Sequence, residues 1–164
     1  MKKFVSFVSA LALCVMMVPQ QAKAIGVSFN AQGVVNQPVG TLADGAGLGV
    51  GAMLGAKVDV AIMVATLRAG YVHNLEKNGV SSSNIPILAG LRYQLAIPGV
   101  GVFLGLEGGL NKGEHDSTVG MNAYIGGEIG PLEVTAGLNV LDIDHFGDSQ
   151  ALMFTVGYDL FSLP

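Results

Sequence analysis

The residues with the clearest chemical potential are a few ionisable side chains within otherwise apolar segments. Arg68 and Arg92 are basic, Glu107 and Glu128 are acidic, and Tyr124 adds a hydroxyl group. A charge taken out of water is heavily penalised unless an opposite charge and hydrogen bonds compensate it. The sequence therefore predicts that these five side chains form a buried network of ion pairs and hydrogen bonds. Separately hydrated charges are the alternative.

A glycine-rich segment at residues 45–51, GAGLGVG, could be mistaken for a nucleotide-binding loop. Its glycines recur at every second position, whereas a dinucleotide fingerprint needs G-x-G-x-x-G, a following helix and an acidic partner. Neither the helix nor the partner occurs at that spacing. We interpret the segment as a strand with one face cleared of side chains, and we expect no cofactor.

An acidic segment at residues 142–148 hints at a calcium loop, but it lacks the ligands such a loop needs. Phe146 occupies the third ligand position, and Met153 stands where the bidentate Glu belongs. We expect no metal site here. Adventitious binding of a divalent cation stays an alternative, through Asp142, Asp144 and Asp148 together with Glu114, His115 and Asp116.

The composition of the 164-residue chain excludes several classes of protein. Hydrophobic residues make up 51% and charged residues 12%, with one cysteine and a net charge of −4. Disordered chains have low hydrophobicity, disulfide scaffolds have many cysteines, and nucleic-acid binders carry a basic surplus. We therefore expect a folded chain with no nucleic-acid partner.

The N-terminus has the pattern of a secretory signal peptide. Lys2 and Lys3 precede an apolar run at residues 4–18, and a small-residue motif ends at Ala24. The sequence predicts a cleaved signal peptide at residues 1–24 and a mature domain at residues 25–164. Removing three lysines with the signal leaves five basic residues against twelve acidic ones, a net charge of −7.

The mature chain alternates between apolar and polar residues with a period of two, which indicates β-strands. Eight strands of about 9 to 12 residues are predicted, close to the length that a tilted strand needs to cross a bilayer. The alternation covers residues 27–32, 47–54, 85–95, 102–107, 121–128, 133–140 and 152–160, and less clearly 60–73.

The predicted links alternate between long and short, as in outer-membrane barrels with long extracellular loops and short periplasmic turns. The long links lie near residues 36–45, 74–84, 111–118 and 142–149, and the short ones near 57–59, 98–99 and 130–131. This order predicts an even number of strands, with both termini on the periplasmic side.

The composition of the two strand faces predicts which one meets lipid. A soluble barrel exposes its polar face to water and is rich in Lys, Glu and Asp there. Here the polar face is mostly Gly, Asn, Gln, Thr and Ser, and the apolar face is almost unbroken. We therefore expect an all-β, eight-stranded antiparallel up-and-down transmembrane β-barrel, with lipid outside. Such a barrel is filled by its own side chains, which predicts a plugged lumen.

This pattern resembles the small eight-stranded outer-membrane β-barrel superfamily, the class of the OmpX and OmpA barrel domains. The resemblance covers the whole mature chain and includes the segment IPILAGLRY at residues 85–93, which follows a polar loop. It implies a Gram-negative outer membrane, with lipid and lipopolysaccharide around the barrel and the barrel-assembly machinery as partner during insertion. Two departures are that Ser162-Leu163-Pro164 follow Phe161, and that aromatic girdles are thin.

Some barrels of this class are lipid A deacylases, and His115-Asp116-Ser117 resembles their His-x-Ser element, with Glu128 downstream. Ser117 and Glu128 would lie about 36 Å apart on one strand, with opposite side-chain directions. We therefore predict no catalytic site. The expected role is that of a monomeric, non-enzymatic envelope protein, either structural or interacting through acidic extracellular loops. A narrow channel, a lipid A-modifying enzyme and a soluble ligand-binding β-barrel are the alternatives.

Overall fold

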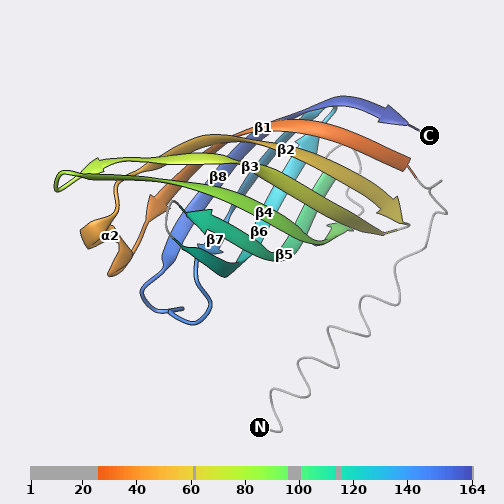
Figure 1. Ribbon diagram of the computed structural model, residues 1–164. Coiled ribbons are helices and arrows are strands. Elements are labelled where there is room, and N and C mark those ends of the chain that lie inside the picture. Colours follow the sequence, from red (N-terminus) through yellow and green to blue (C-terminus); the bar gives the residue numbers. More distant parts are fainter. Residues whose placement is uncertain (1–25, 61, 96–100, 114–115, 164) are drawn as a thin grey trace, which may run out of the picture.

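The computed structural model describes residues 26–60, 62–95, 101–113 and 116–163, which form eight strands and one short helix. Neighbours along the chain pair antiparallel, and the last strand pairs with the first, so that the sheet closes into a barrel (Figure 1). The predicted all-β fold, an eight-stranded antiparallel up-and-down barrel, is confirmed. The strands are β1 (Gly26–Pro38), β2 (Gly49–Val60), β3 (Met63–Lys77), β4 (Val80–Leu95), β5 (Gly101–Gly113), β6 (Ser117–Ile129), β7 (Leu132–Val140) and β8 (Gln150–Leu163).

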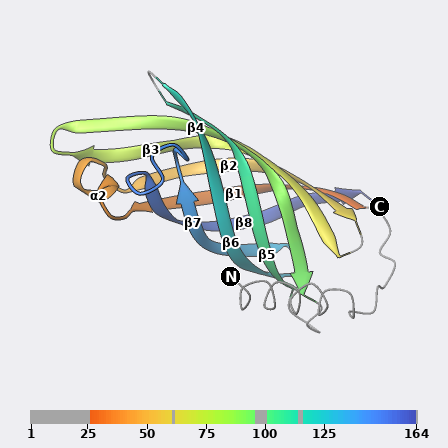
Figure 2. The same cartoon turned by 90° about the horizontal axis from the view of Figure 1, so that it is seen from below.

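The long links gather at one end of the barrel, which we call the loop end. Figures 1 and 2 both show the start of β1 and the end of β8 at the opposite end, the turn end. The link from β1 to β2 contains the short helix α2 (Leu42–Gly45), and no helix among the described residues is long and apolar enough to cross a bilayer. The β6–β7 turn is Gly130-Pro131, as predicted. The predicted signal peptide and the predicted turn at Pro98-Gly99 lie outside the described residues.

The predicted loop at residues 74–84 is instead mostly strand. β3 and β4 continue to Lys77 and Val80, and only Asn78 and Gly79 separate them. Both turn residues have positive φ angles, 55° and 80°, which suits a tight hairpin turn between twisted strands. The polar residues that indicated a loop therefore belong to a hairpin whose tip extends beyond the rest of the barrel (Figure 1).

The barrel closes between β1 and β8 through an irregular register. Phe29 pairs with Phe161, whereas the next residue, Asn30, pairs with Asp159, which leaves Leu160 as an extra residue in β8. The bulge places Leu160 and Phe161 both on the outer surface, each 54% exposed. The Phe161 ring stacks on Phe29 with 4.8 Å between centroids. The aromatic residue near the C-terminus thus packs on the outside of the closing seam.

The apolar faces of the strands point outward and the polar faces point into the lumen, as predicted. Each strand thereby contributes to a belt of exposed apolar side chains. The members of this belt include Leu54, Leu67, Leu91, Leu104, Leu106, Ile125, Val134 and Val156, each at least half exposed. Buried positions hold Asn, Gln, Thr, Lys, Arg and Glu instead. This distribution is the reverse of a water-soluble barrel and matches a barrel surrounded by lipid.

The lumen is not polar along its whole length. Five buried apolar side chains form a cluster nearer the loop end, which we call the apolar layer: Val34, Met53, Val72, Leu88 and Met153. The charged residues lie closer to the turn end. The lumen therefore holds two consecutive layers of packed side chains, one apolar and one charged.

Candidate functional site: the closed lumen

Glu107 on β5 is the centre of one group of polar contacts in the lumen. Its carboxylate accepts a hydrogen bond from Thr66 Oγ1 at 2.8 Å and one from Tyr124 Oη at 3.3 Å. It also forms an ion pair with Arg68, whose guanidinium lies 5.1 Å from the centre of the Tyr124 ring. Glu107 is 1% exposed, so its charge is compensated entirely by neighbours from β3 and β6.

Glu133 on β7 is the centre of a second group. Arg92 Nη1 lies 2.6 Å from Glu133 Oε2, and Lys57 Nζ lies 3.3 Å from the same oxygen. The second carboxylate oxygen accepts a hydrogen bond from Gln32 Nε2 at 3.2 Å. One carboxylate thereby connects side chains from β1, β2 and β4, which lie far apart in the sequence.

Both cations of the Glu133 group have a second carboxylate partner nearer the turn end. Lys57 Nζ lies 2.6 Å from Asp159 Oδ1, and Arg92 Nη2 lies 3.0 Å from Glu128 Oε2. The Arg92 guanidinium also stacks over Phe103, 4.3 Å from its ring centre. Three cations therefore alternate with four carboxylates across the barrel, and every charge in this set has an opposite charge beside it.

Gln32 on β1 joins the two groups. Its Oε1 accepts a hydrogen bond from Arg68 Nη1 at 3.1 Å, while its Nε2 donates to Glu133. A single connected set of hydrogen bonds thus runs from Thr66 to Asp159. We call the charged members and Gln32 the lumen network: Gln32, Lys57, Arg68, Arg92, Glu107, Glu128, Glu133 and Asp159.

All five residues that the sequence analysis selected, Arg68, Arg92, Glu107, Glu128 and Tyr124, lie in this region of the lumen. The selection omitted Lys57, Glu133 and Asp159. Lys57 was placed in a short turn at residues 57–59, which is wrong, because β2 continues to Val60. Lys57 lies on the same strand face as Gly55 and Met53, and extending the alternation to residue 57 would have predicted that its side chain points into the lumen.

Little space is left between these side chains. A cavity of about 10 Å³ lies between Asn30, Lys57, Arg68 and Glu133. That volume holds about one water molecule. Asn30 Oδ1 and the Nε atoms of Arg68 and Arg92 are buried without a partner among the described residues, so a single water there would have polar groups to bind. The described side chains around these carboxylates leave no room for a substrate between them.

The other candidate residues that the structure describes lie apart from one another. Ser117 and Glu128 lie at opposite ends of β6, with Glu128 in the lumen network, and His115 lies outside the described residues. Gly49 and Gly51 fall in β2 on the lumen side, where a Cβ at Gly49 would lie 3.0 Å from the Val72 side chain. This crowding accounts for these two glycines without a ligand. The predicted strand is wrong for residues 45–48, because Gly45 is the last residue of α2, β2 begins at Gly49, and a Cβ at Gly45 would meet no neighbouring atom.

The acidic link between β7 and β8 is held by its own side chains. His145 Nδ1 lies 2.8 Å from Asp142 Oδ2, and this hydrogen bond raises the pKa of His145 above 6.5 and lowers the pKa of Asp142 below 3.8. Thr41 Oγ1 donates to Asp148 at 2.6 Å, which ties this link to the one that carries α2. No cluster of three or more potential metal ligands occurs in the described part of the chain.

Comparison with known proteins supports the fold. No protein-family model and no curated protein sequence matches the chain. The structure matches the crystal structure of Neisserial surface protein A (NspA), with a TM-score of 0.62 and 14% sequence identity. The match covers 81% of this chain and 94% of that chain. At this identity the likeness shows the fold alone, and that fold is a closed eight-stranded barrel.

Proposed function

We propose that this chain is an outer-membrane barrel protein that acts as a non-enzymatic element of the cell envelope and interacts at the surface through its loops. The observation that carries the proposal is the closed lumen. A charged network and an apolar layer fill the barrel in series, and the space left in the network is about 10 Å³. The space between the described side chains of these two layers is too small for a solute to pass through them.

Two further features support this role. The exposed apolar belt fits a lipid environment, since a charge facing lipid at the bilayer centre costs about 2 to 4 kcal/mol. The loop end carries acidic side chains that face solvent: Asp44, Glu76, Asp116, Asp144 and Asp148. With the proposed signal peptide at residues 1–24 supplying export, these groups would face the outside of the cell and be available to a partner.

A conductance measurement separates this proposal from the alternative of a narrow channel. The purified protein is inserted in planar lipid bilayers, with a porin inserted in parallel as the positive control. We expect no steady conductance steps from this protein, because both layers of the lumen are filled. Reproducible unit steps from the wild-type barrel would contradict the plug and favour the channel.

A further inference from the structure

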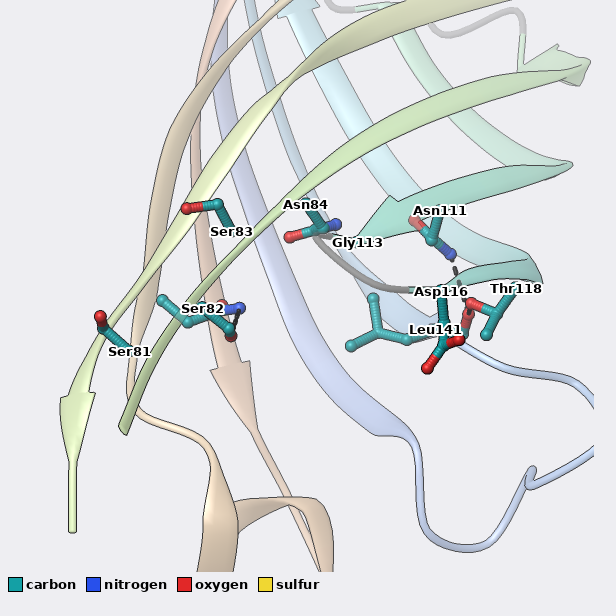
Figure 3. A pocket seen from close by; sticks show the side chains of 10 residues that line it. Ser81, Ser82, Ser83, Asn84, Asn111, Gly113, Asp116, Thr118 and Leu141 are labelled. Atoms are coloured by element: carbon teal, nitrogen blue, oxygen red, sulfur yellow. Dashed lines mark hydrogen bonds between the residues drawn. The ribbon is translucent and has the colours of Figure 1, made fainter. Parts of the chain in front are cut away.

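A second, larger cavity lies at the loop end, on the far side of the apolar layer from the lumen network. Its volume is about 430 Å³, within the range of about 300 to 1,000 Å³ that is usual for small-molecule sites. Strands β3, β4, β5 and β6 and the start of the β7–β8 link form its walls (Figure 3). We call this cavity the vestibule. Because the lumen below it is filled, the vestibule is a pocket with a closed floor.

Most of the described residues that line the vestibule carry neutral hydrogen-bonding side chains, although most of its exposed surface is apolar. The strand alternation directs Asn74, Ser82, Asn84, Asn111 and Thr118 toward the inside of the barrel, because they share a face with residues that point into the lumen. Among the described residues that line the vestibule, Asp116 is the single ionised side chain and none is cationic. This charge distribution disfavours an anionic ligand.

The amides and hydroxyls are partly held in place and partly available. Asn74 Nδ2 donates to Ser82 Oγ at 2.9 Å, which leaves the Ser82 hydroxyl hydrogen for another acceptor. Asn111 Nδ2 donates to the carbonyl of Leu141 at 3.0 Å (Figure 3), and its Oδ1 is buried without a partner in the described part of the chain. A buried acceptor without a donor is unfavourable, and this oxygen would gain a donor from a ligand if the Asn111 side chain turned toward the vestibule.

We propose that the vestibule binds a neutral, hydroxyl-rich ligand, the pyranose units of a saccharide. A sugar hydroxyl both donates and accepts, which suits walls made of amides and hydroxyls, and the Leu141 side chain offers an apolar contact for the C–H groups of a ring. This proposal names a ligand class for the surface role proposed above, and it therefore rests on that proposed function. The closed lumen is tested separately by conductance, so that failure of one proposal can be distinguished from failure of the other.

The test is saturation-transfer difference NMR on the full mature barrel in a detergent without a sugar headgroup. The probes are methyl glucoside, methyl galactoside, methyl N-acetylglucosaminide and the disaccharides maltose and lactose. Glucuronate serves as the anionic comparison. We expect millimolar binding of at least one neutral probe and weaker binding of glucuronate. Saturation transfer to none of the neutral probes, or equal transfer to glucuronate, would overturn the proposal.

Variants locate the site. Asn84→Leu removes an amide that lines the vestibule, while Gln37→Leu removes an exposed amide near the same end of the barrel but on its outer face. Losing about two hydrogen bonds is expected to weaken binding by about tenfold in Asn84→Leu, whereas Gln37→Leu should bind as wild type. Heat-modifiable gel mobility checks that both variants fold, and Asn84→Ala, which also removes the amide, replaces Asn84→Leu if that variant does not fold. Equal binding by Asn84→Leu and Gln37→Leu, or by a folded Asn84→Ala and wild type, would place the ligand elsewhere.

Discussion

The substitution Glu133→Gln is expected to destabilise the folded barrel by about 3 kcal/mol. Removing one partner from a buried ion pair costs about 3 to 5 kcal/mol, because the other charge is left uncompensated. Here Arg92 and Lys57 both lose a contact, but each keeps a second carboxylate, Glu128 and Asp159 respectively. The lower end of that range therefore applies.

Urea-induced unfolding in lipid vesicles measures this loss, and Glu128→Gln is the matched control. Glu128 has the same chemistry and also contacts Arg92, but its side chain is 25% exposed, against 5% for Glu133. We expect the control to lose about 1 kcal/mol, since water can replace part of the interaction. If Glu133→Gln and Glu128→Gln lower the free energy of unfolding by the same amount, burial in the lumen network does not strengthen the ion pairs.

A second large effect is expected when an alanine replaces Gly109 on β5. A Cβ at this position would overlap the carbonyl oxygen of Ile87 on the neighbouring strand and would lie 2.9 Å from Leu88 Cα. Both are backbone atoms, so the strands themselves must move. Overpacking of this kind costs about 1 to 3 kcal/mol, and we expect Gly109→Ala to lie at the upper end of that range.

Its neighbour Gly108 provides the control, because it lies on the outer face of the same strand. The nearest atom to a Cβ at Gly108 is the carbonyl oxygen of Gly120, at 3.8 Å, which is an ordinary contact. Gly108→Ala should therefore unfold at the same urea concentration as wild type. The explanation of the lumen glycines as a steric requirement fails if the two alanine variants have the same stability.

The architecture was predictable because a single strong pattern determines it. Period-two alternation fixes which face of each strand meets lipid, and Leu104, Leu106 and Ile125 lie outside while Glu107 and Tyr124 lie inside, as expected. This pattern is local and independent of how the strands pair. The inward and outward faces of each strand could therefore be predicted from the sequence without knowing which strands pair.

The partners within the lumen network were not predictable in the same way. Glu133 meets Lys57 and Arg92 across 76 and 41 positions in the sequence, and such pairings depend on strand register and barrel curvature. The outward position of Phe161 depends on a bulge at Leu160, which breaks the alternation from which faces were assigned. The extension of β3 and β4 was missed because polar residues outweighed the Asn78-Gly79 turn signal.

The central claim is that the apolar side of this barrel faces outer-membrane lipid, and membrane fractionation with heat-modifiable gel mobility tests it most directly. The full-length chain is expressed in a Gram-negative host, and the outer-membrane fraction is run on a gel with and without boiling. We predict that the protein is found in this fraction and that the unboiled, folded barrel migrates differently from the boiled chain. A soluble periplasmic protein without a mobility shift would contradict the account.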